Sequence, residues 1–200
     1  DFFYFIGPND KSFKVKLYIP IEKEDYINDI IKIMEILHQM YQEDCKQLGN
    51  CKFRLGISND NGTFRMVEEA VPKFIKLLDE KTTILSDSKT EPNMLLPTMQ
   101  TPSGAKVGVM PDFGGSYLMF SATIIEGYVN YCVSNKNYPN LEGLSEYANY
   151  LSQKINDDSD TSKCLKRWGG FDEEGVHTYF TIFNDVISNQ IVLNEQEGGK

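Results

Sequence analysis

The clearest alternation of apolar and polar residues along this chain runs from Ser12 to Ile19. Its apolar positions are Val15, Leu17 and Ile19, and its intervening polar positions are Lys14, Lys16 and Tyr18. A strand with this pattern buries one face and presents the other, which here carries two ammonium groups. That second face is either an anion site or a solvated lysine face on an edge strand.

The same design recurs further along the chain. An amphipathic helix is predicted over residues 23–43, from apolar positions at helical spacing: Ile27, Ile30, Ile31, Met34, Leu37, His38 and Tyr41. A second basic strand follows over 51–58, then a tight turn at 59–62, a strand over 63–67 and a helix over 69–80. The pattern predicts an α+β fold, a mainly antiparallel sheet with helices packed on one face. The cations expected on the other face are Lys14, Lys16, Lys52, Arg54 and Arg65.

Three further segments complete the first half of the chain. An aromatic strand over 2–6 is expected to form a hairpin with the strand over 13–19, and a short strand is predicted over 82–85. Residues 92–111 contain four prolines, so a long loop is expected there, with at most a short strand over 106–109. That loop is either a lid or an ordinary surface connection.

The remaining residues predict a set of C-terminal helices. An apolar helix over 117–133 has Ser116 as its N-cap, and further helices are predicted over 142–155 and 173–188, with a polar loop over 156–163 between them. Two hundred residues fit one domain. We therefore expect a single α+β domain over 1–200, with a core over 1–133 and a helical extension over 134–200.

Charge and composition narrow the classes of function. The net charge of −9 argues against a protein that coats nucleic acid or binds an anionic membrane, although a local basic pocket is compatible with it. No apolar run approaches the roughly 20 residues that a membrane helix needs. The four cysteines lack Cys-x-x-Cys spacing and are expected to be reduced thiols, with a Cys45–Cys51 pair as the alternative. With two histidines, a histidine-based metal site or catalytic triad is not expected.

The order of these segments resembles a known family. The segments that carry the likeness lie between Asp1 and Val133: the Phe3-Tyr4-Phe5 strand, Lys14-Val15-Lys16-Leu17-Tyr18, Lys52-Phe53-Arg54, Leu96-Pro97-Thr98, Gly104-x-x-x-Gly108 and Gly115-Ser116-Tyr117. In this outline the chain is similar to the Hop A type III effector family of plant-pathogenic bacteria. Related proteins act as lyases in lanthipeptide biosynthesis, and their fold resembles that of the phosphothreonine lyases. The resemblance implies a bacterial protein that stays in the cytoplasm or is secreted into a host cell.

The resemblance also implies roles for individual residues. Lys14 falls at the position of the catalytic base and Lys16 at that of the acid. Lys52 and Arg54 fall at positions that bind the phosphate or the carbonyl. The histidine, the tyrosine and one arginine of the lyase pattern are absent from this chain.

The residue types themselves suit the same chemistry. Eliminating phosphate from phosphoserine or phosphothreonine needs a base for the Cα proton, a cation beside the carbonyl, and an acid or cations for the leaving group. Lysines and arginines supply all three without a metal or cofactor, and crowding of like charges lets one lysine lose its proton. Arg65 joins Lys52 and Arg54 as an oxyanion clamp, and the backbone at Ser116 is a further candidate for binding phosphate.

Two functions follow from these residues. The first is a metal-independent phosphoserine or phosphothreonine lyase that acts on a peptide or protein. The alternative is an inactive effector or a peptide-binding protein that uses the same cationic groove, with a kinase or a host protein as its partner. The acidic net charge disfavours a nucleic-acid partner.

Overall fold

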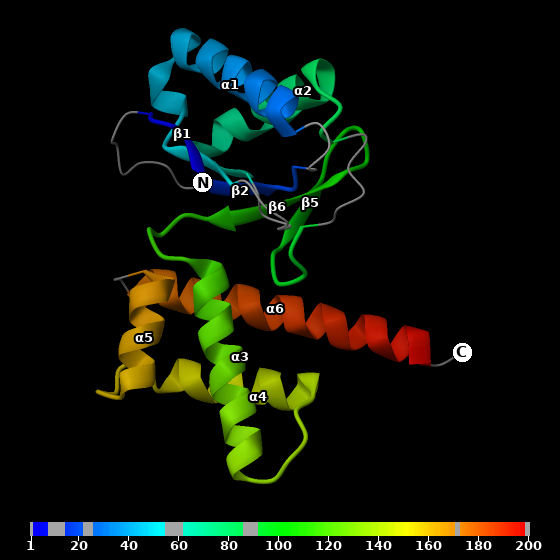
Figure 1. Ribbon diagram of the computed structural model, residues 1–200. Helices are drawn as coiled ribbons and strands as arrows, with labels where there is room; N and C mark the ends of the chain where they lie inside the picture. The colour runs from blue at the N-terminus through cyan, green and yellow to red at the C-terminus, as the bar shows by residue number, and fades with distance from the viewer. Residues whose placement is uncertain are drawn as a thin grey trace. The chain divides into compact units, whose positions relative to one another are not determined.

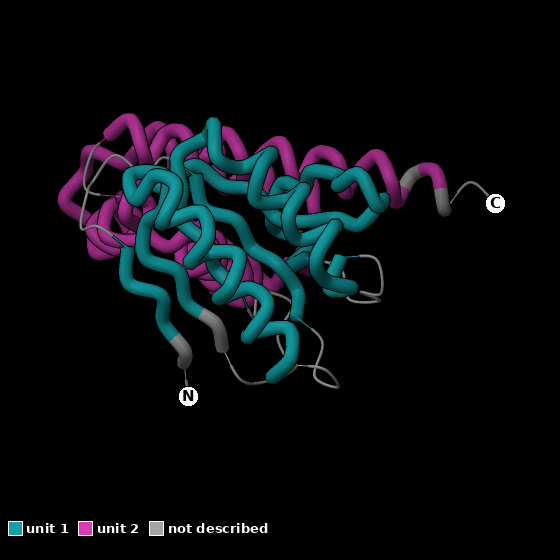
Figure 2. Tube along the Cα trace, turned by 90° about the horizontal axis from the view of Figure 1, so that it is seen from above, with its two compact units in different colours: residues 1–112 teal, residues 113–200 magenta. Residues whose placement is uncertain are grey.

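The computed structural model describes residues 2–7, 15–21, 26–54, 62–85, 92–170 and 173–198, and the structural statements below concern these residues. They form an α+β fold, and all of the strand pairs among them are antiparallel. Contacts divide the chain into two compact units (Figure 2), unit 1 over Asp1–Asp112 and unit 2 over Phe113–Lys200. Sequence analysis expected one domain with its helical extension starting after Val133. The helix before that point, α3 (Tyr117–Ser134), packs instead with the C-terminal helices, mainly with α5 (Asp160–Gly169).

Unit 1 is a six-stranded sheet with two helices over one face (Figure 1). Its strands are β1 (Phe2–Phe5), β2 (Val15–Ile19), β3 (Cys51–Arg54), β4 (Gly62–Met66), β5 (Thr98–Gln100) and β6 (Lys106–Pro111). Its helices are α1 (Tyr26–Glu43) and α2 (Val71–Lys81), with single 3-10 turns at Cys45–Gln47 and Glu68–Ala70. The spatial order β1-β3-β4-β2-β6-β5 places β2 in the interior of the sheet.

The core of unit 1 lies between the sheet and the two helices. Leu17 and Ile19 of β2 and Phe64 of β4 are fully or nearly fully buried, as are Phe74 and Leu78 of α2. Leu17 and Ile19 alternate along β2, as Phe64 and the buried Met66 do along β4. The intervening residues, Lys16, Tyr18 and Arg65, therefore point to the other face. The alternation that was read from the sequence therefore determines which face carries the cations.

Three predictions for unit 1 were wrong. β1 pairs with β3 instead of forming a hairpin with β2, because β4 and β6 occupy both edges of β2. The segment after α2 is not a strand: Thr82 Oγ1 donates to the Leu78 carbonyl at 2.6 Å and accepts from Ile84 N–H at 3.3 Å, which ends the helix. The proline-rich segment contains a β5–β6 hairpin, in which Met99 pairs with Val107.

Unit 2 is helical. It contains α3 (Tyr117–Ser134), α4 (Leu141–Gln153), α5 (Asp160–Gly169) and α6 (Glu173–Gly198), with α4 packed along α6 and α3 against α5. Helix α5 replaces much of the polar loop that was predicted over 156–163. Ser159 caps its first turn by accepting from Ser162 N–H at 3.1 Å, and Leu165 is buried. The cap and this buried leucine stabilise a helix in a stretch that is otherwise largely polar.

Candidate functional site

Two of the predicted cations, Lys16 and Arg65, come together at the centre of the sheet of unit 1. β2 lies between β4 and β6, and Lys16 is paired directly with Arg65 of β4. Lys16 is only 4% exposed, so it is not a solvated lysine on an edge strand. Two like charges directly opposite each other in a sheet are destabilising unless a third group compensates them.

Asp112 supplies that compensation from the end of β6. Its Oδ1 lies 3.1 Å from Lys16 Nζ, and its Oδ2 lies 2.7 Å from Arg65 Nε. The side chains of Lys16 and Asp112 are 5% and 7% exposed, whereas that of Arg65 is 31% exposed. One carboxylate therefore bridges a buried ammonium and a partly exposed guanidinium that come from neighbouring strands.

The surroundings of Lys16 lower its pKa. Burial contributes most, because it disfavours the charged ammonium, and the positive charges of Arg65 and Lys52 act in the same direction. The Asp112 carboxylate opposes them without offsetting them fully. Lys16 therefore loses its proton at lower pH than an ordinary lysine.

Lys52 and Asn50 extend the site along β3. Lys52 is exposed and pairs with Thr63, one strand beyond the Lys16–Arg65 pair. Arg65 Nη1 donates to the Asn50 carbonyl at 3.5 Å, so the guanidinium is held by both a carboxylate and a backbone oxygen. We call Lys16, Lys52, Arg65 and Asp112 the sheet-face cluster.

The other predicted site residues stand differently. Lys14 lies outside the described residues. Arg54 is the last residue of β3 and pairs with Phe2, but its side chain is outside the described part of the structure. Ser116 belongs to unit 2, where its hydroxyl oxygen accepts from Met119 N–H at 3.4 Å as the N-cap of α3. Thus the structure brings Lys16, Lys52 and Arg65 together.

Sequence reasoning missed Asp112. It follows Pro111 at the end of β6, directly after the segment 92–111, for which a loop with at most a short strand is expected. The signal that could have found it is general: two basic residues that share one face of a sheet need a carboxylate nearby if that face is buried. An acidic residue at the end of a strand next to the basic strand was the candidate to look for.

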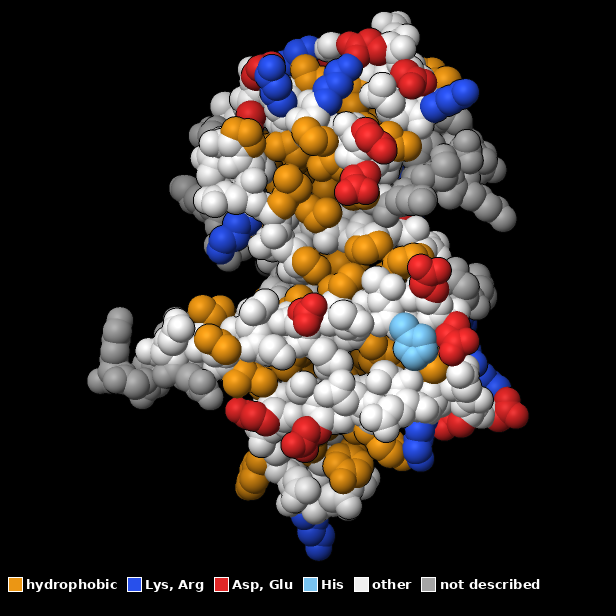
Figure 3. Space-filling model, turned by 180° about the vertical axis from the view of Figure 1, so that it is seen from behind, with side chains coloured by type: hydrophobic (Ala, Val, Ile, Leu, Met, Phe, Trp, Pro, Cys, Tyr) orange, Lys and Arg blue, Asp and Glu red, His pale blue; other side chains and the backbone are white. Residues whose placement is uncertain are grey.

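All four cysteines are free thiols, and burial raises the pKa of Cys51 to about 12. No group of three histidine, cysteine or acidic side chains in the described residues is placed to hold a metal ion. On the face that Figure 3 shows, lysines and arginines are dispersed among acidic and apolar side chains, so that face carries no broad basic field.

Comparison with known proteins returns no match: no family model, no curated protein and no solved structure is similar to this chain. Among the described residues, no helix combines the length and the apolar character needed to cross a membrane.

Proposed function

We propose that unit 1 binds a phosphorylated serine or threonine side chain of a peptide or protein at the sheet-face cluster and eliminates its phosphate without a metal. The bridging of Lys16 and Arg65 by the Asp112 carboxylate carries this proposal. The Asp112 carboxylate is bound by an ammonium and a guanidinium, and the same two cations would bind a substrate oxyanion in the same way. A phosphate would exchange with Asp112, and the partly exposed Arg65 and the exposed Lys52 would meet it first.

The elimination needs a base in addition to the groups of this cluster. Lys14, which the resemblance gives the role of base, would remove the Cα proton, the electron pair of that bond would form the Cα=Cβ double bond, and the Cβ–O bond would break with its electrons leaving on the phosphate. Arg65 would stabilise the oxyanions, and Lys16 would protonate the leaving group, the role that the resemblance gives it. A lowered pKa makes the Lys16 ammonium a stronger acid, which favours this role. The product is dehydroalanine or dehydrobutyrine plus phosphate.

Mass spectrometry of a phosphopeptide library after incubation with the full chain tests the reaction. Turnover appears as a loss of about 98 mass units, the mass of phosphoric acid, with no dephosphorylated serine or threonine product. Lys16→Met is expected to reduce the rate at least about 100-fold, since one general acid contributes typically about 10²–10⁴-fold. Lys76→Met, at an exposed lysine of α2, is the matched control and is expected to leave the rate unchanged. If Lys16→Met folds and reacts at the control rate, the proposed role of Lys16 is wrong.

The pH profile separates two roles for Lys16. If its ammonium is the acid, the rate falls as pH rises through its pKa; if its neutral amine is the base, the rate rises over the same range. Either slope has to be absent from Lys16→Met. A rate with the same pH profile in both proteins would contradict both roles.

One observation favours binding without turnover as a second candidate function. Asp112 already pairs with both Lys16 and Arg65, and Lys16 is buried, so a substrate would need to displace a well-placed carboxylate. In that case fluorescence polarisation detects a labelled phosphopeptide bound at Lys52 and Arg65, while the peptide mass stays constant. Binding that is lost in Lys52→Met, without any mass change, would favour this candidate over the lyase.

A further inference from the structure

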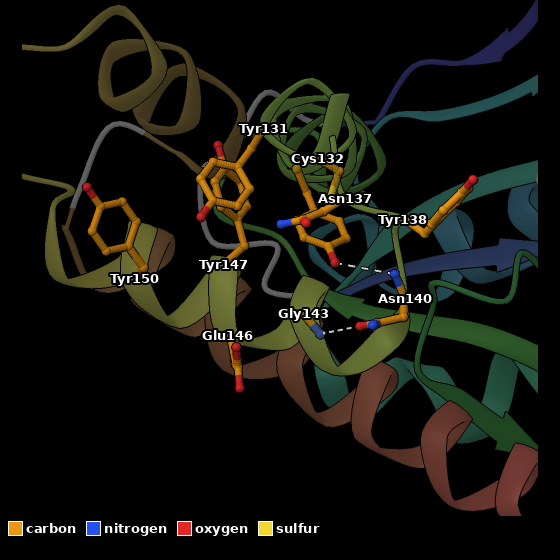
Figure 4. Close-up of a pocket in the computed structure, with 10 residues that line it drawn as sticks. Tyr131, Cys132, Asn137, Tyr138, Asn140, Gly143, Glu146, Tyr147 and Tyr150 are labelled. Atoms are coloured by element: carbon orange, nitrogen blue, oxygen red, sulfur yellow. Dashed lines mark hydrogen bonds between the residues drawn. The ribbon is translucent and has the colours of Figure 1, made fainter. Parts of the chain in front are cut away.

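A pocket in unit 2 is lined largely by tyrosines. It has a volume of about 950 Å³ and lies between the C-terminal half of α3, the loop after it and the first turns of α4 (Figure 4). Its tyrosines are Tyr128 and Tyr131 of α3, Tyr138 of the loop, and Tyr147 and Tyr150 of α4. We call it the tyrosine pocket. Its volume lies near the upper end of the usual range for small-ligand sites, about 300–1,000 Å³.

Two glycines allow one tyrosine from each of α3 and α4 to pack against the backbone of the other helix. A Cβ atom on Gly143 of α4 would lie 2.2 Å from the hydroxyl oxygen of Tyr128, and one on Gly127 of α3 would lie 2.8 Å from that of Tyr147. Asn140 N–H also donates to the Tyr128 hydroxyl at 3.3 Å. Each ring is therefore fixed against the backbone of the opposite helix, so the wall of the pocket is formed before any ligand arrives.

The rings that remain on the surface expose a large aromatic area. Tyr131, Tyr138 and Tyr150 are 52%, 93% and 51% exposed. The ring of Tyr147 lies 5.7 Å from that of Tyr128 and 5.8 Å from that of Tyr131, with tilts of 41° and 32°. Figure 4 shows Tyr131 and Tyr147 close together at one side of the pocket. Exposed aromatic faces that gather around a pocket favour a ligand that interacts with π electrons.

The charge around the pocket favours a cation. Glu146 is the one carboxylate among the ten lining residues, and none of the ten is a lysine or an arginine. Residues 113–200 carry twelve acidic and six basic side chains. In Figure 4 the Glu146 side chain points away from Tyr131 and Tyr147, so its contribution is that of a charge on the rim.

The chain itself provides an example of the interaction. Lys154, just after α4, has its Nζ 4.6 Å from the centre of the Tyr150 ring. This distance is within the range of about 6 Å at which an ammonium group is attracted to an aromatic face. A tyrosine at the rim of the pocket thus already contacts a cation of this chemistry.

We propose that the tyrosine pocket binds a methylated or quaternary ammonium group, carried by a lysine side chain of a peptide or by a small free amine. The exposed ring faces supply the attraction for the positive charge, and apolar methyl groups contact these faces at a lower desolvation cost than a compact, strongly hydrated ammonium. Glu146 adds a favourable field at the rim. This inference is independent of the chemistry proposed for unit 1.

Calorimetric titration of the full chain compares a cation with its neutral isostere. Choline and 3,3-dimethylbutan-1-ol have nearly the same shape and differ in charge. We expect choline to bind at least about tenfold more tightly, since cation–π contacts account for that order of difference. Equal affinity of the two probes, or no binding of choline at millimolar concentration together with no binding of a trimethyllysine peptide, would overturn the proposal. A peptide with trimethyllysine that binds at least tenfold more tightly than choline identifies a peptide as the source, and the reverse order identifies a free amine.

Substitutions at Tyr131 assign the binding to the pocket. Because this residue is half exposed, Tyr131→Leu and Tyr131→Phe are both expected to fold. Tyr131→Leu removes a ring face and should weaken binding several-fold to about tenfold, whereas Tyr131→Phe keeps the face and should stay within about twofold of the wild type. Tyr41→Leu, at a partly exposed tyrosine of α1, is the control. If Tyr131→Leu binds choline as tightly as Tyr41→Leu does, the cation is not bound in the tyrosine pocket.

Discussion

Replacing Asp112 by asparagine is expected to destabilise unit 1 far more than the loss of a surface ion pair would. The change keeps the size of the side chain but leaves the buried Lys16 ammonium beside Arg65 without its carboxylate. Breaking a buried ion pair by removing one partner costs about 3–5 kcal/mol. We expect a loss of about 3 kcal/mol in the free energy of unfolding, at the lower end of this range. The reason is that Arg65 is about one-third exposed and can turn to water, and Lys16 can lose its proton.

A second variant separates the cost of an unpaired charge from the value of the pair. Lys16→Met combined with Asp112→Leu replaces both buried charges by apolar side chains of similar volume. Such replacements are often neutral or stabilising, so this double variant is expected to unfold within about 1 kcal/mol of the wild type. Glu80→Gln is the surface control, because the Lys76–Glu80 pair spans one helical turn at 3.6 Å with both side chains more than half exposed. It should cost about 0.5 kcal/mol or less.

The assay has to follow unit 1 by itself. The one tryptophan, Trp168, lies in unit 2, so its fluorescence reports that unit, while native-state hydrogen exchange of the β2 and β4 amides reports unit 1. We expect Asp112→Asn to raise the exchange rates of β2 and β4 and to leave the urea midpoint of Trp168 fluorescence nearly unchanged. If Asp112→Asn costs no more than Glu80→Gln, or the double variant is no more stable than Asp112→Asn, the argument from buried charge is wrong.

Three further predictions concern Lys16, Ser116 and Gly115. The pKa of Lys16 is lowered in the folded protein, so as pH rises toward 10.5 the folded state loses this proton while the unfolded state keeps it. In urea titrations at several pH values, the stability of the wild type relative to Lys16→Met should therefore rise as pH approaches 10.5. A difference that falls with rising pH would mean that the pKa of Lys16 is not lowered by folding. Ser116→Ala removes the N-cap of α3 and should lower the free energy of unfolding of unit 2 in urea by about 0.5–1 kcal/mol. Ser116→Asp should restore it. An unchanged stability of Ser116→Ala would argue against capping. Gly115→Ala would bring a Cβ to 2.1 Å from the Trp168 carbonyl oxygen. We expect it to lower the free energy of unfolding by at least about 1–3 kcal/mol and to shift the Trp168 emission. A variant with wild-type stability would mean that this close approach is not needed.

The sequence predicted those parts of the fold that depend on local pattern. The alternation in β2 correctly gave its apolar core positions, Leu17 and Ile19, and the Ser116 cap gave the start of α3. Helix α1 was found, but its buried face was misplaced by part of a turn. Ile30 and Leu37 are buried as predicted, but Ile27 and Ile31 are exposed. Three residues outside the predicted set complete the core face: Ile33, Ile36 and Met40. In a helix with apolar residues on several sides, spacing alone does not decide which side meets the sheet.

The failures came from contacts between distant residues. Pairing of β1 with β3 joins segments about fifty residues apart, and nothing in the sequence of either strand specifies that partner. The candidate site shows the same limit. The cationic face was predictable because Lys16 and Arg65 alternate with apolar residues, but their register, and the arrival of Asp112 from β6, are products of the tertiary fold. The tyrosine pocket had a visible signal, since five of the eleven tyrosines lie between positions 128 and 150.

The buried charges of the sheet-face cluster raise a question that stability alone does not answer. Lys16 lies on a central strand between two others, where valine or methionine would pack without a desolvation cost. If the Met/Leu double variant is as stable as the wild type, the fold has no need of the ion pair. A buried ion pair whose desolvation cost cancels its contribution to stability is then better explained by a role of its charges in binding. The anion exchange proposed for Lys16, Arg65 and Asp112 is the explanation that these contacts support. If the double variant is instead several kcal/mol less stable than the wild type, the cluster is accounted for by folding, and the argument for binding has to rest on the exposed Lys52 and Arg65 alone.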